Sequence, residues 1–340
     1  MWNSGRFVLR RGGVQACGAQ SSGERFRTTR KKSSGLATLA HDEILVPEKA
    51  SDGMRTVMFF HGLLGSGRNW RTFAKRLASE AQEQSGDQFP GWRMMLVDLR
   101  NHGNSASRGF SPPHDMPSAA RDVVELIKTS SCGWPDIVVS HSMGGKVALQ
   151  FGQNAAAGHY GDVTPPKQLW ILDSVPGKLP IRNSEGEVEL VLSTILSLPD
   201  PLPSRRWLMN HMLEKGFSKS LSDWLGSNLK RTGSGEEMTW VFNPKEAYEM
   251  FNSYRNSDYW PVLDSPPKGM DVHIVRASRS DLWSPESISK LERLSSDTVA
   301  DQNSGKVHYH VLQNAGHWLH VDNPEGLAEI LLPSFLKLSK

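Results

Sequence analysis

Residues 135–147 read PDIVVSHSMGGKV and combine a short apolar strand, a sharp turn and a helix. The β-branched residues 137–139 predict the strand, and the small residues after Met143 predict a helix whose backbone approaches its neighbours closely. Ser142 lies at the bend between the two elements. This order of elements is typical of a nucleophile elbow, in which a serine hydroxyl projects above a sheet.

The motif around Ser142 differs in one position from the usual G-x-S-x-G pattern. Here it reads S-x-S-x-G, with Ser140 where the tight turn favours the smallest residue. The N–H of Met143 is expected to face the same space as the Ser142 hydroxyl, beside the positive end of the helix. Met143 is therefore predicted to donate to an oxyanion. The alternative interpretation is an ordinary turn from strand to helix.

A second turn is expected to lie beside the first. Residues 56–60, TVMFF, form an unbroken apolar run, as in a parallel strand that is covered on both faces. The sequence HGLLGS follows immediately, and its Leu63 N–H, or that of Leu64, is predicted to be the second oxyanion donor. The alternative is a glycine turn that needs positive φ, which is compatible with the same role. The residues expected to contact substrate are His61, Gly62, Leu64 and Trp318.

The predicted general base is His317, near the carboxyl end of the chain. It follows a predicted strand at residues 307–312 and precedes a helix that Pro324 opens. It also completes the chain order serine, acid, histidine. His320 is the nearest alternative, and its position close to the helix start favours a structural role. His102 has the wrong place in the chain order for a base.

Two carboxylates are candidates for the acid that orients His317. Asp281 follows a predicted strand at residues 272–275 and precedes His317 by 36 residues, which suits a strand, helix, strand unit. Asp173 ends the strand in LWILD and also lies between Ser142 and His317. Either one could hold the imidazole. The spacing favours Asp281, with Asp173 as the alternative; the structural interpretations are a helix cap for Asp281 and a sheet-end turn for Asp173.

Five segments carry a family resemblance. They read HGLLGSGRNW, VDLRNHGNS, HSMGGKVAL, LDSVPG and NAGHWLHVDNPEG, at residues 61–70, 97–105, 141–149, 172–177 and 314–326. In this order they resemble the α/β-hydrolase superfamily, and within it the abhydrolase subfamily that includes abhydrolase domain-containing protein eleven and small bacterial esterases. Some members of that subfamily place the acid where Asp173 stands.

The resemblance implies an esterase or thioesterase that needs no cofactor and forms an acyl-enzyme on a small-molecule ester or thioester. Ser142 and His317 would belong to its catalytic triad. A serine at the elbow argues against the carboxylate-nucleophile chemistry of haloalkane dehalogenases and epoxide hydrolases. The alternatives are an acyltransferase and a ligand-binding protein on a hydrolase scaffold.

The alternation of strands and helices predicts an α/β fold with a mainly parallel central sheet and helices on both faces. After Pro176 this alternation stops, and residues 177 to about 260 are helix-prone. They are expected to form a helical cap insertion within a hydrolase domain at residues 41–340. The residues expected to brace the site from beside it are Arg100, His102 and Ser105.

The basic charge of the chain is concentrated at its start. Residues 1–32 carry eight basic side chains and one acidic one, a net charge of +7, whereas the whole chain carries +3. The remainder is slightly acidic, which argues against nucleic-acid binding. Residues 1–40 contain arginine and serine, few acids and no apolar core, as organelle transit peptides do. A mitochondrial location is predicted; the alternatives are a plastid, or the cytoplasm if this segment is a disordered tail.

Cysteine and motif content set further expectations. Cys17 lies in the leader and Cys132 in the body, so no disulfide within the body is expected, which fits a reducing compartment. No apolar run approaches the roughly 18 to 20 residues that span a bilayer. Cys/His spacing of the zinc type and a G-x-G-x-x-G motif are both lacking, so neither a metal nor a nucleotide is expected.

Overall fold

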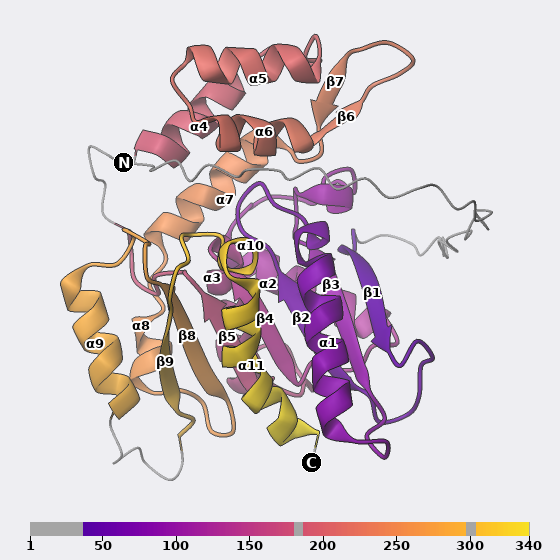
Figure 1. The fold of residues 1–340 in the computed structure, drawn as a ribbon, viewed down its shortest axis with the longest axis vertical. Coiled ribbons are helices and arrows are strands. Elements are labelled where there is room, and N and C mark those ends of the chain that lie inside the picture. Colours follow the sequence, from indigo (N-terminus) through magenta and orange to yellow (C-terminus); the bar gives the residue numbers. More distant parts are fainter. Residues whose placement is uncertain (1–36, 180–185, 297–303, 340) are drawn as a thin grey trace, which may run out of the picture. The chain divides into compact units, whose positions relative to one another are not determined.

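A seven-stranded sheet in the order β1-β3-β2-β4-β5-β8-β9 forms the centre of the fold (Figure 1). The computed structural model describes residues 37–179, 186–296 and 304–339. β1 is antiparallel to β3, and the other neighbouring strands are parallel. The strands are β1 (Ala40–Val46), β2 (Arg55–Phe60), β3 (Trp92–Asp98), β4 (Ile137–His141), β5 (Gln168–Leu172), β8 (Asp271–Ala277) and β9 (Val307–Leu312).

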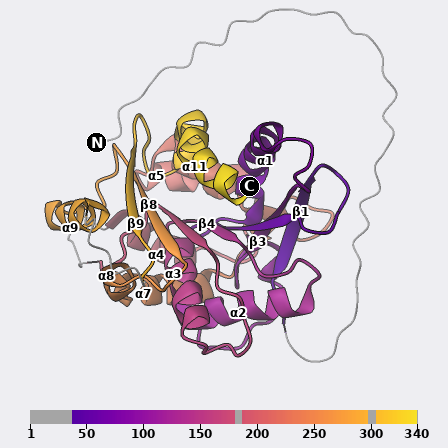
Figure 2. The ribbon, with the colours of Figure 1, turned by 90° about the horizontal axis from the view of Figure 1, so that it is seen from below.

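Helices cover both faces of this sheet. Figure 2 shows α1 and α11 on one side and α2 and α3 on the other. The predicted fold class is thereby confirmed. The helices of this layer arrangement are α1 (Arg71–Ser85), α2 (Met116–Thr129), α3 (Met143–Ala156), α8 (Trp260–Asp264), α9 (Pro285–Ser296), α10 (Leu319–Asp322) and α11 (Pro324–Leu338), with short 3-10 turns at Gly67–Trp70 and Gly103–Ser105.

The alternation of side chains along β2 shows how one apolar strand supplies two cores. Val57 and Phe59 pack in the layer that contains α1 and α11. Met58 and Phe60 point the other way and pack with α2 and α3. All four side chains are fully buried, which explains why the sequence of this strand is a continuous apolar run.

Between β5 and β8 the chain leaves the sheet and builds an insertion that includes the predicted cap. Its core is separate from the two sheet layers and includes Leu208, Met212 and Trp240. The hairpin formed by β6 and β7 lies within a segment for which the sequence predicts only helices. The elements of the cap are α4 (Gly186–Ser197), α5 (Arg205–Glu214), α6 (Lys219–Ser227), β6 (Leu229–Arg231), β7 (Met238–Trp240) and α7 (Pro244–Asn256).

The folded body begins slightly before the predicted boundary at residue 41. The compact unit starts at Ala37, and Leu39 is already buried in the core. The rest of the predicted leader, residues 1–36, lies outside the described residues. Of the described helices, none is both long enough and apolar enough to cross a membrane.

Candidate active site

Ser142 lies at the elbow between β4 and α3, with φ 51° and ψ −121°. A β-carbon on Gly144 would lie 2.6 Å from the carbonyl oxygen of His61, and one on Gly145 would lie 2.7 Å from Cβ of Ser174. Glycine is needed at both positions because the first turn of α3 packs against backbone and side chains at the ends of β2 and β5. Ser140 stands where the usual G-x-S-x-G motif has its first glycine. The buried Ser140 hydroxyl has a partner there, because it donates to the Trp170 carbonyl at 2.8 Å.

His317 connects the elbow to a carboxylate. Its Nε2 lies 3.1 Å from Ser142 Oγ, and its Nδ1 lies 2.8 Å from Asp173 Oδ2. The three residues follow β4, β5 and β9, so they meet at the carboxyl edge of the parallel strands, where open α/β sheets place their sites. Asp173 is fully buried, which removes water from its bond to the imidazole.

The carboxylate that reaches His317 belongs to Asp173, so the preference for Asp281 is wrong. Asp173 Oδ1 accepts from Trp283 Nε1 at 2.8 Å and from the Ala277 N–H at 3.2 Å. Asp281 is exposed on the loop after β8. That loop contributes an indole donor to the acid instead of the acid itself.

His141 is a neighbour of the site that the sequence did not reveal. Its Nε2–H donates to the His317 carbonyl at 2.7 Å, and its ring centroid lies 4.6 Å from that of His317. Burial, and then the nearby His317 and His320 rings, hold the pKa of His141 well below its usual value. His141 therefore remains neutral and positions the histidine loop.

His320 has the structural surroundings that the sequence favoured. Its ring lies 4.3 Å from the ring of Trp70, centroid to centroid. Burial lowers the pKa of His320 to about 4, with a further contribution from His317. Its ring also lies 5.6 Å from the ring of His141, centroid to centroid.

The turn after β2 lies directly against the nucleophile. A β-carbon on Gly62 would lie 3.1 Å from Cβ of Ser142, so only glycine allows this approach. The Gly65 N–H donates to the Gly62 carbonyl at 3.1 Å, which closes the turn, and Leu64 has a φ of 58°. Leu63 therefore lies on the same turn as the glycine that touches the elbow.

His61 was predicted to contact substrate, and the structure corrects this. Its Nδ1–H donates to the Gly62 carbonyl at 2.7 Å, and its Nε2 accepts from Leu99 N–H at 3.0 Å. The side chain is 2% exposed, and burial lowers its pKa to about 4. Both ring nitrogens are thus used to fix the turn to the end of β3.

The loop after β3, which was predicted to brace the site, is held by its own hydrogen bonds and contacts the turn after β2 through the His102 and His61 rings, whose centroids are 5.2 Å apart. Arg100 forms a bidentate pair with Asp122 at 2.6 and 3.0 Å. Ser105 Oγ donates to the Asp98 carbonyl at 2.7 Å. His102 is fully buried and its Nδ1 lies 2.8 Å from the Arg100 carbonyl, within the same loop.

The cap reaches the site through aromatic side chains. The ring centroid of Trp224 in α6 lies 5.7 Å from that of Trp318, the residue after His317. Tyr254 of α7 is buried near the hydroxyls of Ser174 and Ser142, and burial raises the pKa of Tyr254 to about 12. Its hydroxyl is therefore protonated beside the nucleophile. Sequence reasoning missed Tyr254, because it lies in a helix far from every motif.

Lys146 connects the elbow helix to both ends of the cap. Its Nζ donates to the carbonyls of Gly177 and Tyr254 at 2.7 Å each and to that of Ser257 at 2.9 Å. The side chain is fully buried, and its ammonium lies 4.6 Å from the centre of the Tyr254 ring. Three carbonyl acceptors match the three donors of an ammonium group.

The chain matches the alpha/beta hydrolase family over residues 57–330. It is 25% identical over 284 residues to the sn-1-specific diacylglycerol lipase ABHD11 of Mus musculus, covering 82% of this chain and 80% of that protein. It is 22% identical over 276 residues to esterase YbfF of Escherichia coli (strain K12), covering 80% of this chain and 89% of that one. Among solved structures, a marine microorganism esterase is similar to this chain, with a TM-score of 0.64 and 20% sequence identity. The match covers 89% of this chain and 100% of the esterase chain.

These similarities extend over the sheet and not only over single motifs. The region that matches the family contains most of β2 and every later strand, together with the elbow and the loops of the candidate site. The relatives named above are lipases and esterases, and the solved structure shares the fold. Ser142, Asp173 and His317 all lie within the matching region, and the chain belongs to the alpha/beta hydrolase family.

Proposed function

We propose that this protein is a serine hydrolase of carboxylic esters or thioesters that works through an acyl-enzyme. The observation that carries the proposal is the continuous hydrogen-bonded path from Ser142 Oγ through the His317 imidazole to the Asp173 carboxylate. Nucleophile, base and orienting acid are the three parts that serine acyl transfer requires.

In the first half of the reaction, Ser142 Oγ attacks the substrate carbonyl carbon while His317 Nε2 takes the hydroxyl proton. The tetrahedral intermediate collapses, and His317 returns the proton to the leaving alcohol or thiol. In the second half, water attacks the acyl-enzyme with His317 again as base, which releases the acid and restores Ser142. Asp173 holds the imidazole in the required tautomer and stabilises its charged form, and the Trp283 and Ala277 donors hold Asp173 in place.

The proposed oxyanion hole consists of the N–H groups of Leu63 and Met143. The proximity of Gly62 to Ser142 and the start of α3 at Met143 support this assignment. A donor of this kind contributes about 3 kcal/mol to stabilising the transition state. The turn backbone at Gly62 and Leu64 and the indole of Trp318 are proposed to face the substrate, with the cap above them.

The substrate class is proposed from the relatives and from the cap. One relative is named as a diacylglycerol lipase and another as an esterase. The contact between Trp224 and Trp318 brings apolar cap surface to the histidine loop, which suits an acyl group better than a charged one. We therefore propose a small or acyl-chain ester or thioester.

Turnover of a graded panel tests this function. p-Nitrophenyl esters and acyl-CoAs of increasing chain length would be supplied to the wild-type chain and to Ser142→Ala. Hydrolysis that falls by about four to six orders of magnitude in Ser142→Ala, with an unchanged circular dichroism spectrum, supports the proposal. A variant that keeps a tenth of the activity contradicts it.

The same panel separates the alternatives. An acyltransferase would release product faster when an alcohol acceptor is added and would form the new ester in preference to the free acid. A ligand-binding protein would bind the panel members without turnover. Either result would replace hydrolysis as the function.

A further inference from the structure

Two parallel strands bring three side chains of metal-binding types together at the edge of the sheet, far from the nucleophile. Asp271 and His273 lie two residues apart on β8, so they share a face. His308 of β9 pairs directly with His273 in the strand register. One ligand atom from each of Asp271, His273 and His308 lies within 4.8 Å of the other two.

We infer that Asp271, His273 and His308 form a binding site for a divalent transition-metal cation of the zinc class. Two imidazoles and one carboxylate are the donor set that Zn²⁺, Co²⁺ and Ni²⁺ accept, whereas Mg²⁺ and Ca²⁺ prefer oxygen ligands alone. A water molecule would complete four-coordination on the open side.

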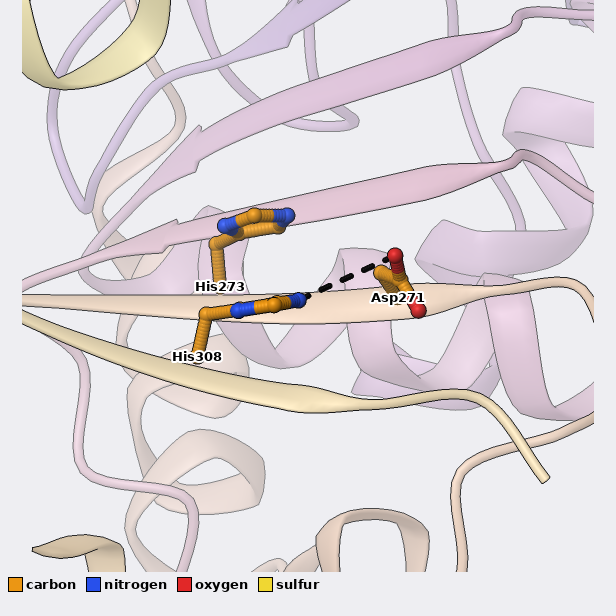
Figure 3. Close-up of side chains that lie close together, drawn as sticks. All are labelled: Asp271, His273 and His308. Carbon is orange, nitrogen blue, oxygen red and sulfur yellow. Dashed lines mark ion pairs between the residues drawn. The ribbon is translucent and has the colours of Figure 1, made fainter. Parts of the chain in front are cut away.

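The two rings are arranged so that the same nitrogen of each faces Asp271. In Figure 3, the Nε2 ends of His273 and His308 both point along the strands toward the carboxylate. His308 Nε2 lies 3.8 Å from Asp271 Oδ2, which is longer than a hydrogen bond. Other parts of the described chain offer no hydrogen-bond partner to His273 Nε2, so its lone pair remains available.

His310 and Trp170 already hold the ring of His273 in place. Its Nδ1 lies 3.2 Å from Nε2 of His310, and a hydrogen bond from Nδ1–H leaves the lone pair on the Nε2 side. The ring is 5% exposed and stacks on Trp170 with centroids 3.9 Å apart. One ligand is therefore fixed before any cation arrives.

The other two ligands are partly exposed, and Asp271 keeps one oxygen for a cation: its Oδ1 accepts from the Lys306 N–H at 2.9 Å, which leaves Oδ2. The side chains of His308 and Asp271 are 36% and 41% exposed. Tetrahedral zinc with bonds of about 2.0–2.1 Å separates its ligand atoms by about 3.3 Å, so the atoms must approach by up to about 1.5 Å. Because the rings of His273 and His308 are now stacked at 4.3 Å, closure requires the exposed His308 ring to tilt.

The site is separate from the triad. The Asp173 carboxylate accepts from Ala277, four residues beyond His273 on β8, which corresponds to about 13 Å along the strand. Lys337 of α11 is the cation whose charge acts on His273. Its side chain is exposed, so it opposes cation binding only weakly. Removing its charge should lower the Kd for Zn²⁺, whereas removing a ligand should raise it.

Calorimetric titration of the metal-free, untagged full chain with ZnCl₂ tests the inference. We expect one equivalent of Zn²⁺ per chain, with MgCl₂ and CaCl₂ giving no saturable heat. CoCl₂ should produce the strong visible absorption of a four-coordinate Co²⁺ complex with nitrogen and oxygen ligands. Absence of saturable Zn²⁺ binding would overturn the inference.

Variants of the exposed ligands locate the bound ion without threatening the core. His308→Gln and Asp271→Asn should each raise the Kd for Zn²⁺ at least about tenfold, whereas His159→Gln, an exposed histidine elsewhere, should leave it unchanged. Lys337→Gln should lower the Kd only slightly. Binding that persists in His308→Gln and Asp271→Asn, or that disappears in His317→Ala, would place the ion elsewhere and contradict the inference.

Discussion

Asp173 is held by donors from three separate segments, and this makes its role testable at the level of single atoms. We expect Asp173→Asn to lower kcat by up to about 10⁴, because the amide keeps the shape of the carboxylate but favours the wrong tautomer of His317. Steady-state hydrolysis with a p-nitrophenyl ester measures the loss. Asp281→Asn is the matched control and should stay within about twofold of wild type, since Asp281 is exposed. Loss of turnover in Asp281→Asn, with Asp173→Asn active, would contradict this assignment.

The difference between these two aspartates also shows what local sequence can specify. Ser142 could be predicted because a strand, a bend and small residues lie together within one short segment. Asp173 could not be chosen over Asp281, because both satisfy the chain order. Its selection depends on the indole of Trp283, 110 residues away, which occupies the place expected for the other acid. His141 and Tyr254 were missed for a similar reason, since their partners are distant in sequence.

At the scale of elements, Lys146 is the point where α3 holds the cap. We expect Lys146→Met to lower the free energy of unfolding by about 3 kcal/mol or more, because three buried carbonyls lose their donor. Hydrogen exchange should rise at residues 177–179 and at the end of α7. Chemical denaturation and exchange mass spectrometry measure these effects.

A control for Lys146→Met is available on α2. Lys128 is exposed and makes one hydrogen bond, to the Tyr160 carbonyl at 3.2 Å. Lys128→Met should change the unfolding free energy by less than about 0.5 kcal/mol. Equal effects in the two variants would show that the buried ammonium does not hold the cap.

Strands differ in how well the sequence predicted them, and burial explains the difference. The runs that became β2 and β4 are apolar because both their faces are covered. β1 was not predicted, since AHDEILV pairs at the sheet edge and carries polar side chains. The strands β6 and β7 are three residues each, too short to show a periodicity of their own, and they pair with each other and, at Met238, with Leu202. The cluster of Asp271, His273 and His308 could not be predicted, because it depends on the register in which β8 pairs with β9. The sequence spacing of these residues does not reveal that register.

At the scale of the whole molecule, several buried histidines make stability depend on pH. Burial lowers the pKa of His61 and His320 to about 4 and that of His102 to about 3. In the unfolded chain a histidine has a pKa of about 6.5. As the pH falls below that value, the unfolded chain binds protons that the folded chain excludes.

The free energy of unfolding should therefore fall as the pH drops from about 6.5 toward 4, by up to about 1.4 kcal/mol per pH unit for each such histidine. This contribution is fully present above about pH 6.5. Urea denaturation at about pH 7.5 and about pH 5 measures the change. Equal stability at the two pH values would contradict the neutral, buried state of these rings.

The first 36 residues should be dispensable for catalysis. A chain that begins at Ala37 keeps Leu39 and all of β1, so its kcat/KM and its unfolding free energy should match those of the full chain. A chain that begins after Val46 lacks an edge strand and should be less stable. Loss of activity on removal of residues 1–36 alone would show that the leader belongs to the folded enzyme.

We propose in addition that this leader directs import into mitochondria, on the basis of its net charge of +7 over residues 1–32. Residues 1–36 fused to a fluorescent reporter should carry the reporter into that organelle. Replacing the basic residues of the fused segment with glutamine should abolish import. A reporter that enters plastids or stays in the cytoplasm would refute the proposal.

The most direct test of the central claim is to map the site of phosphonylation by a fluorophosphonate. Intact-mass and peptide mass spectrometry should show one phosphonyl group on Ser142 in the wild-type chain, no labelling in Ser142→Ala, and much slower labelling in His317→Ala, because the probe reacts only with a serine activated by its base. A folded wild-type chain that stays unlabelled, or that is labelled at another residue and equally in Ser142→Ala, would contradict the account.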